Sequence, residues 1–416
     1  MSAKAKKSQK MTGVIGWIDE RLPIFTMLGK EYGRYPMPRN CNYLWSFGGM
    51  SMFMLVVMVL TGILLAMHYT PHIDMAFDSV ERINRDVNSG WLMRSIHMNG
   101  ASMFFIVVYI HMLRGLYYGS YKQPRELLWI FGVVILILMM ATAFLGYSLV
   151  WGQMSYWAVT VISGLLTAIP LVGEDLMVWL RGGFAVDNAT LNRFFVLHYL
   201  LPFVIIGMVV LHVAALHITG SNNPAGIDPK GPQDTLPFHP YMTAKDILAL
   251  SVFLVFYAVF VFFYPDALGH PDNYIPANPL QTPAHIVPEW YFLPFYAMLR
   301  AMTFDIFFIS AKLIGVIVMF GALVLLVLAP WLDTSPVRSC RYRPFYRQFF
   351  WLLVVALVVL TYVGGKPAEG LYVLVAQLAT LYYYLHFLVV MPVLGRLERP
   401  RPLPVSIREP VLGEAS

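Results

Sequence analysis

The sequence predicts an all-α protein that crosses a membrane eight times, and three observations support this fold class. Of the 416 residues, 58% are hydrophobic and only 12% are charged, and the mean hydropathy is +0.63. Apolar runs of roughly 20 residues, long enough to cross the hydrocarbon core, recur along the chain. Lys and Arg are concentrated in every second connection between these apolar runs, which places those connections on one side of the membrane. The eight expected helices lie near residues 44–66, 92–116, 127–150, 194–217, 246–264, 311–331, 349–364 and 371–393.

The basic residues predict which side of the membrane each segment occupies. They are frequent in the N-terminal segment, which contains Lys4, Lys6, Lys7 and Lys10, and again at 338–347. Because cytoplasmic loops carry an excess of Lys and Arg, we expect both termini in the cytoplasm. The net charge of +6 fits attraction to anionic membrane lipids and requires no nucleic acid partner.

This map divides the chain into five expected segments. The first four helices would form one bundle, and the last four a second domain. The segments are a cytoplasmic amphipathic segment (1–43), a four-helix bundle (44–220), a cytoplasmic linker (221–245), a C-terminal four-helix domain (246–395) and a cytoplasmic tail (396–416).

Two histidine pairs stand out on the second and fourth expected helices. His97 and His111 are fourteen residues apart, and so are His198 and His212. At about 100° and about 1.5 Å per residue, each pair lies near one helix face, about 21 Å apart along the axis. A single histidine on an apolar helix is more often a packed side chain. Four that share one spacing need partners in hydrocarbon, and two axially ligated haems would supply them.

The expected topology decides which histidines pair. Both helices run from the outer to the inner side, so His97 and His198 lie at the outer level and His111 and His212 at the inner level. We therefore expect one haem between each pair, which makes the first four helices a di-haem bundle. Six-coordinate haems of this kind suit electron transfer more than oxygen binding.

Glycines repeat the same interval on the first and third helices. Gly48 and Gly62 are fourteen residues apart, as are Gly132 and Gly146. A missing side chain lets a wide planar ring approach the backbone closely, although small residues also pack membrane helices for other reasons. Because these helices run in the opposite direction, Gly62 and Gly146 would face the outer haem, and Gly48 and Gly132 the inner one.

Two arginines lie one helical turn from a histidine, toward the nearer membrane surface. Arg94 precedes His97 by three residues, and Arg114 follows His111 by three. Their guanidinium groups could pair with haem propionates, or they could extend to the lipid headgroups; their positions do not decide between the two.

Five strings of residues resemble one family. The chain is similar to the cytochrome b subunits of bacterial cytochrome bc1 complexes (ubiquinol:cytochrome c oxidoreductases) over nearly its whole length. The undivided chain and the equal histidine intervals fit the respiratory type better than the photosynthetic one. The strings are GWLMRSIHMNGAS, GYSLVWGQMSYWA, GGFAVDNATLNRFF, HITGSNNPAGID and PEWY, the last at 288–291.

The resemblance implies a Q cycle in a bacterial inner membrane. Quinol is oxidised at an outer site, one electron passes through a Rieske [2Fe-2S] protein to cytochrome c1, and the other crosses two haem b groups to reduce quinone at an inner site. Ubiquinol and ubiquinone would be the substrates, in a homodimer of the complex. The implied haem residues are His97 and His198 with Arg94 and Arg193 for the outer, low-potential haem, and His111 and His212 with Arg114, Ser120, Trp129 and Asn222 for the inner, high-potential haem.

An outer quinol site is expected in a proline-rich stretch between the fifth and sixth helices. Proline breaks helices, so irregular backbone is expected there. Glu289 lies in this stretch and could accept a proton from quinol, or it could be a structural polar anchor. Ala158 stands where close relatives carry glycine, which affects the shape of the pocket. The resemblance brings Phe144, Tyr147, Tyr291 and Tyr296 to Glu289.

An inner quinone site is expected where the fourth helix ends and the fifth begins. Reduction of a quinone needs proton donors, and His217 and Asp246 would supply them. By position alone, Asp246 could equally stabilise the N-terminus of its own helix. Ser221 and Lys245 are secondary members of this site.

A different class of function competes with this interpretation. Intramembrane His, Glu and Asp could form the proton relay of a proton-coupled membrane transporter. No inverted repeat is visible in the sequence, and the glycine spacing would then be a coincidence. A purely structural membrane subunit is disfavoured by the four histidines. A reduced-minus-oxidised spectrum discriminates, because a transporter would show no b-type absorbance.

Overall fold

The computed structural model describes residues 12–408, and its main elements are long α-helices. Within these residues, eight helical stretches are long and apolar enough to cross a membrane, which confirms the predicted fold class. Lys4, Lys6, Lys7 and Lys10, used above to orient the chain, lie outside the described residues. The stretches are Tyr43–Ala66, Gly90–Tyr118, Glu126–Ser148, Asn188–Thr219, Phe238–Phe262, Ala311–Leu332, Pro344–Gly364 and Gly370–Leu397.

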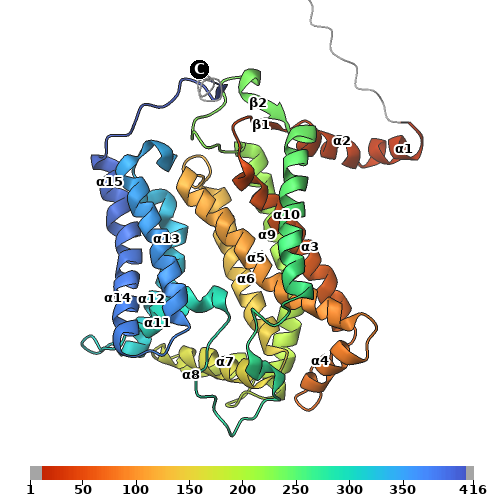
Figure 1. Cartoon of the computed structure of the whole chain (residues 1–416), viewed down its shortest axis with the longest axis vertical. Helices are drawn as coiled ribbons and strands as arrows, with labels where there is room; N and C mark the ends of the chain where they lie inside the picture. Colours follow the sequence, from red (N-terminus) through yellow and green to blue (C-terminus); the bar gives the residue numbers. More distant parts are fainter. Residues whose placement is uncertain (1–11, 409–416) are drawn as a thin grey trace, which may run out of the picture.

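Four of these helices form a bundle in the N-terminal half (Figure 1). Helix α3 packs against α5, and α6 packs against α9. Helix α9 begins after Asp187, whose carboxylate accepts the backbone N–H of Ala189 at 3.0 Å and caps the helix. Helix α5 ends at Gly119, which has a φ of +67° and lies too close to the Arg338 backbone for a side chain. The bounds are α3 Phe47–Ala66, α5 Gly90–Tyr118, α6 Glu126–Ser148 and α9 Asn188–Thr219.

The helices of the C-terminal half divide between two places. Helix α10 packs against α3 and α5 of the first bundle, whereas α11, α12, α13 and α14 pack on one another. Figure 1 shows α10 beside α3, apart from the blue helices α13 to α15. The first long helix of the expected C-terminal domain (246–395) thus packs on the first bundle. The bounds are α10 Thr243–Phe262, α11 Leu293–Arg300, α12 Ala311–Leu332, α13 Pro344–Gly364, α14 Gly370–Leu385 and α15 Met391–Leu397.

Short elements close the two ends of the molecule. The end with α1, α2 and a two-stranded antiparallel sheet of β1 and β2 also holds the chain beyond α15, and we call it the inner end; α4, α7 and α8 lie at the outer end (Figure 1). The bounds are α1 Gly13–Arg21, α2 Ile24–Leu28, β1 Pro36–Pro38, α4 Ala76–Arg85, α7 Gln153–Gly164, α8 Gly173–Arg181 and β2 Thr235–Pro237. Short 3-10 turns span Tyr43–Ser46, Leu165–Ala168, Pro232–Asp234, Pro271–Tyr274, Trp290–Phe292 and Cys340–Tyr342, and π-helical turns span Gly29–Gly33, Phe238–Met242 and His386–Val390.

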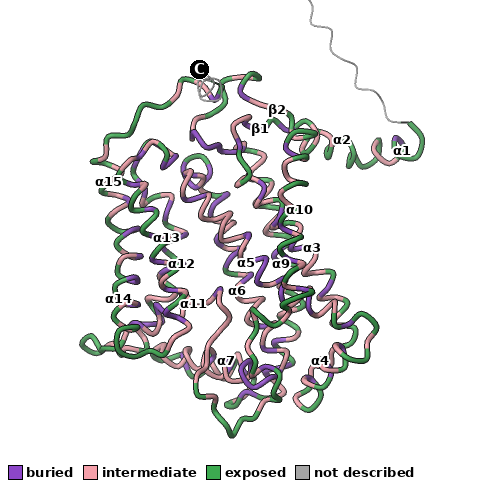
Figure 2. The backbone as a smooth tube through the Cα atoms, in the orientation of Figure 1, coloured by how far each residue is buried: buried purple, intermediate pink, exposed green. Residues whose placement is uncertain are grey.

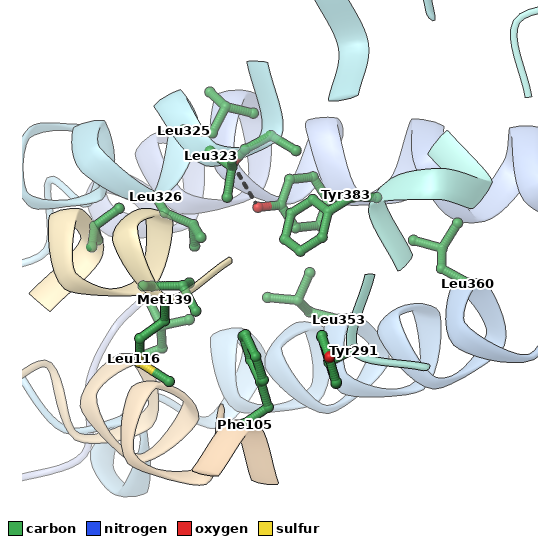
Figure 3. Packing of buried hydrophobic residues seen from close by; sticks show 14 of the residues in the cluster. Phe105, Leu116, Met139, Tyr291, Leu323, Leu325, Leu326, Leu353, Leu360 and Tyr383 are labelled. Atoms are coloured by element: carbon green, nitrogen blue, oxygen red, sulfur yellow. Dashed lines mark hydrogen bonds between the residues drawn. The ribbon is translucent and has the colours of Figure 1, made fainter. Parts of the chain in front are cut away.

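The buried residues lie where helices meet, and the outward faces are apolar. Figure 2 shows buried positions between the helices and exposed positions around the outside. Large apolar side chains such as Leu60, Val210 and Val255 are exposed, as expected of surfaces that face lipid. In the core, Phe105 and Tyr291 lie near Leu353 (Figure 3), so α5 and the segment before α11 share one packed interior.

A buried cluster of charges joins the two halves at the inner end. Asp333, which follows α12, lies with its Oδ2 atom 3.0 Å from Lys122 Nζ and 2.8 Å from Arg343 Nη1. The Tyr121 hydroxyl donates to the same oxygen at 2.5 Å. All four side chains are buried. Such a pairing is stable only while every charge keeps its partner, so it fixes the connection after α5 to the connection between α12 and α13.

Candidate haem and quinone sites

The structure brings the four predicted histidines together in two pairs between α5 and α9. The ring centres of His97 and His198 are 6.2 Å apart, and those of His111 and His212 are 6.3 Å apart. A ring nitrogen lies about 1.1 Å from the centre of an imidazole and binds a metal ion at about 2.0–2.1 Å, so two imidazoles on opposite sides of one ion have centres roughly 6.3 Å apart. Both pairs therefore fit axial ligation of one haem iron each.

Both outer histidines are held through their Nδ1 atoms. His97 Nδ1 lies 2.9 Å from Thr61 Oγ1, and His198 Nδ1 lies 2.8 Å from the carbonyl oxygen of Thr142. A metal-ligating histidine usually donates its second N–H to such an oxygen, which fixes the ring and leaves Nε2 for the metal. Both outer rings thus have the hydrogen bonding expected of ligands.

The inner histidine His111 has a different neighbour. Arg114 Nη2 lies 3.0 Å from His111 Nδ1. A guanidinium group only donates hydrogen bonds, so here Nδ1 is the acceptor and Nε2 carries the proton. A ligand role for Nε2 requires Arg114 to release this contact, which suits a residue expected to pair with a propionate.

Each of the four predicted glycines lies against one histidine ring. The tightest approach is at Gly146, where an added Cβ would lie 2.3 Å from His198 Cε1. The other three would lie within 3.2 or 3.3 Å of a histidine Cε1. The glycines are placed at the levels that the antiparallel arrangement predicts, Gly62 against His97, Gly146 against His198, Gly48 against His111 and Gly132 against His212.

A cavity of about 280 Å³ at the outer end contains the outer histidine pair and part of the predicted quinol site. Arg94 lines it, and its guanidinium group lies 5.7 Å from the centre of the Tyr274 ring. Arg193 is held elsewhere: it donates to the carbonyl oxygen of Trp179 and is not among the residues that line the cavity. The lining includes His97, His198, Gly62, Gly146, Tyr147, Glu289 and Tyr291.

Glu289 is a buried carboxyl group in this cavity. Burial raises the pKa of Glu289 to about 8, and Tyr147 interacts with its carboxyl group. Its Oε1 atom is buried and has no hydrogen-bond partner within the described residues. A carboxyl group in this state can exchange a proton near neutral pH and has a free oxygen to receive one.

A second cavity of about 260 Å³ contains the rest of the predicted quinol site. Phe144 and Tyr296 line it, with Ala158 and Pro288, and its walls are almost wholly apolar. The five predicted residues are therefore divided between two cavities. Because Pro288 and Glu289 are consecutive, the backbone of this segment separates the two spaces.

Helix α5 anchors the segment that carries Glu289, through contacts that we did not anticipate from the sequence. Tyr109 donates to the carbonyl oxygen of Tyr291 at 2.6 Å, and Trp290 Nε1 donates to Ser102 Oγ at 3.0 Å. The Phe105 and Tyr291 rings stack with centres 4.1 Å apart. The spacing 102, 105, 109 is that of one helix face, which is the signal available in the sequence.

At the inner end, the two predicted proton donors have separate neighbours. His217 Nδ1 lies 3.1 Å from Glu31 Oε2, a residue that our sequence reasoning missed. Asp246 lies near Gly49, whose added Cβ would be 3.7 Å from Asp246 Oδ2. The secondary members also have partners: Lys245 donates to the Cys41 carbonyl, and Ser221 Oγ accepts from Trp45 Nε1 at 3.2 Å.

The residues implied for the inner haem lie around the ends of α5 and α6. Asn222 Nδ2 donates to Ser120 Oγ at 3.1 Å, while its Oδ1 atom is buried without a partner in the described chain. Trp129 donates to the Leu326 carbonyl at 2.6 Å. Arg114 Nε is likewise buried without a partner. Of these atoms, Arg114 Nε is a donor available to a bound carboxylate, whereas Asn222 Oδ1 is an acceptor and could pair only with a donor.

The fold and the paired histidines define a membrane-spanning cytochrome, and comparison with known proteins agrees. The family model described as Cytochrome b/b6/petB matches residues 33–220, and Cytochrome b(C-terminal)/b6/petD matches residues 276–384. The chain therefore belongs to the cytochrome b family.

Relatives and a solved structure agree over most of the chain. It is 60% identical to the cytochrome b of Rhodospirillum rubrum over 399 residues, which cover 96% of this chain and 97% of the relative. It is 59% identical to the cytochrome b of Rickettsia conorii, with 96% and 98% covered. A chain of a hyperthermophilic respiratory Complex III has a TM-score of 0.86 and 33% identity, covering 92% of this chain and 99% of that one. The protein is thus a cytochrome b of a bc1-type complex, an electron-transfer component.

Proposed function

We propose that this chain oxidises quinol at its outer end and reduces quinone at its inner end, with electrons passing between two b-type haems. His97 and His198 would hold one haem, and His111 and His212 the other. The chain would work beside a Rieske protein and cytochrome c1, in a homodimer of the complex. The basic segments favour a bacterial inner membrane with both termini in the cytoplasm.

The observation that carries this proposal is the shared outer cavity. His97 and His198 line the same space as Glu289. Oxidation of a quinol releases two electrons and two protons, so a proton acceptor must lie close to the electron acceptor. The bound haems would supply one-electron redox chemistry at iron. Glu289 supplies the proton acceptor, because its Oε1 atom is unpartnered among the described residues.

The two outer cavities suggest separate places for binding the quinol ring and for releasing its proton. The cavity lined by Phe144, Ala158 and Tyr296 is almost wholly apolar and suits a quinol ring away from water. Glu289, which lies beside Tyr147 in the first cavity, would turn to the quinol to accept the hydroxyl proton and then return toward Tyr147. That movement carries the proton out of the apolar space and toward the outer surface.

At the inner end, quinone reduction needs protons from the cytoplasmic side. His217 and Asp246 would supply them, with Ser221 and Lys245 shaping the pocket. The side chain of His217 is 17% exposed, so water can restore its proton.

The replacement Glu289→Gln tests this proposal. It removes the proton acceptor and keeps the volume, so we expect quinol oxidation to fall by about 10²-fold, as for loss of a general base. Because burial raises the pKa of Glu289 to about 8, the wild-type rate should rise with pH as the carboxyl group ionises, with the midpoint of the rise near pH 8, and the variant should lose this rise. The measurement is the rate of haem reduction by quinol from pH 5 to 9, with haem content as the control. An unchanged rate and profile would contradict the role.

A further inference from the structure

The N-terminal segment reaches His217 through three side chains. Glu31, in the π-helical turn before β1, lies with Oε2 3.1 Å from His217 Nδ1. The Tyr35 ring stacks on the imidazole, with centres 4.6 Å apart and an interplanar angle of 28°. Tyr32 meets the same ring edge-on at 5.7 Å. One imidazole near the end of α9 is thus held on one nitrogen by Glu31, on a ring face by Tyr35 and through an edge contact by Tyr32.

Other charged groups near this contact leave the pairing intact. Lys30 Nζ lies 3.3 Å from Glu31 Oε1, the carboxylate oxygen that does not face His217. Arg125 donates to the backbone carbonyls of Thr219 and Gly220, just beyond the histidine. Glu31 therefore keeps one oxygen for the imidazole.

This contact decides which nitrogen of His217 can exchange a proton with a ligand. An ionised carboxylate only accepts hydrogen bonds, so Glu31 takes the Nδ1–H. Nε2 is then the nitrogen that binds and releases a further proton. When quinone takes up electrons from the chain, the Nε2–H bond of the imidazolium breaks and an O–H bond forms on the quinone oxygen. The imidazole is left neutral, with Nδ1–H still bonded to Glu31, and a proton from water returns to Nε2.

We propose that Glu31 is a positioning residue of the inner quinone site, which orients His217 so that Nε2 delivers the proton. The inference rests on the proposed role of His217 in quinone reduction. It gives the N-terminal amphipathic segment a part in turnover, beyond its place at the membrane surface. Tyr35 supports the same orientation by stacking.

The test compares replacements of Glu31 in the intact membrane complex. The readout is the rate at which added ubiquinone reoxidises the reduced inner haem, with the haem difference spectrum recorded for each variant. We expect Glu31→Ala to slow reoxidation about 10-fold, a part of the 10²–10⁴ that a general acid contributes. Glu31→Gln should restore most of the rate, because its amide oxygen can accept the same Nδ1–H. Glu20→Ala, at an exposed acidic position on α1, should match the wild type.

Two results would overturn the inference. One is a normal rate in Glu31→Ala, and the other is a Glu31→Gln rate as low as that of Glu31→Ala. Glu31→Met, which keeps the side-chain length, replaces the alanine variant if the latter does not assemble. The variant His217→Ala separates this inference from the proposed function. If His217→Ala slows haem reoxidation but Glu31→Ala does not, only the role of Glu31 is rejected. If His217→Ala reoxidises the haem at the normal rate, the proposed inner quinone site is itself rejected.

Discussion

Helix α5 is attached to the C-terminal half of the protein at two places, one in the middle of the helix and one just beyond its inner end, and the two attachments differ in kind. In the middle part of the helix, Ser102 and Tyr109 make neutral hydrogen bonds to Trp290 and Tyr291. Beyond the inner end, in the connection to α6, Lys122 belongs to a buried cluster in which Lys122 and Arg343 share Asp333. Neutral bonds are individually modest, whereas a buried charge that loses its partner is costly. The ionic attachment is therefore suited to holding the halves together, and the neutral one to adjusting the Glu289 segment.

The largest effect should come from breaking the ionic attachment. Asp333→Asn leaves Lys122 and Arg343 buried beside a neutral amide, and we expect a loss of about 3–5 kcal/mol of stability. The measurement is the thermal midpoint of the detergent-solubilised protein. Asp74→Asn is the control, because Asp74 pairs with His72 at the exposed surface, where such pairs contribute about 0–1 kcal/mol. Equal midpoints for the two variants would show that the buried cluster does not hold the halves together.

An intermediate effect is expected where the glycines meet the histidines. Gly146→Ala places a Cβ 2.3 Å from His198 Cε1, so a ring or helix must shift, at a cost of about 1–3 kcal/mol. Gly132→Ala is the matched variant at the inner level, with a tolerable 3.3 Å to His212 Cε1. We expect less haem in the first variant than in the second, measured by pyridine haemochrome assay. More haem in Gly146→Ala than in Gly132→Ala would mean that haem binding at the outer level does not depend on the close approach of Gly146 to His198.

The smallest effect is expected at the neutral attachment in the middle of α5. Tyr109→Phe removes one hydrogen bond to Tyr291 and keeps the ring, so we expect about 1 kcal/mol of lost stability or less. Quinol oxidation should slow a few-fold while the haem spectrum stays unchanged. Tyr264→Phe, at an exposed tyrosine, provides the control. A quinol oxidation rate equal to that control would show that α5 does not position the Glu289 segment.

The sequence was sufficient for features that depend on local periodicity. Hydropathy alone placed all eight helices, and the fourteen-residue spacing of His97 with His111 and of His198 with His212 predicted pairs that the structure brings together. The depth at which each glycine meets a histidine followed from the alternating direction of the helices. These features repeat along one helix, so they are visible without knowledge of contacts between distant segments.

Features that depend on irregular segments were not predicted. Glu31 reaches His217 only because the N-terminal segment folds back across the inner end, and no periodic pattern encodes that return. The division of the quinol residues between two cavities depends on the backbone path at Pro288 and Glu289. Arg193, in helix α9, donates to the Trp179 carbonyl, and its assignment to the outer haem stays a prediction from the resemblance. Loop paths are set by tertiary contacts, which a single sequence does not reveal.

A redox titration of the intact protein, followed by its difference spectrum, tests the central claim most directly. Two separate b-type components should appear, and His212→Ala should remove the higher-potential one while leaving the other. A protein without haem absorbance, or a single component that persists in His212→Ala, would contradict electron transfer between two histidine-ligated haems at different depths.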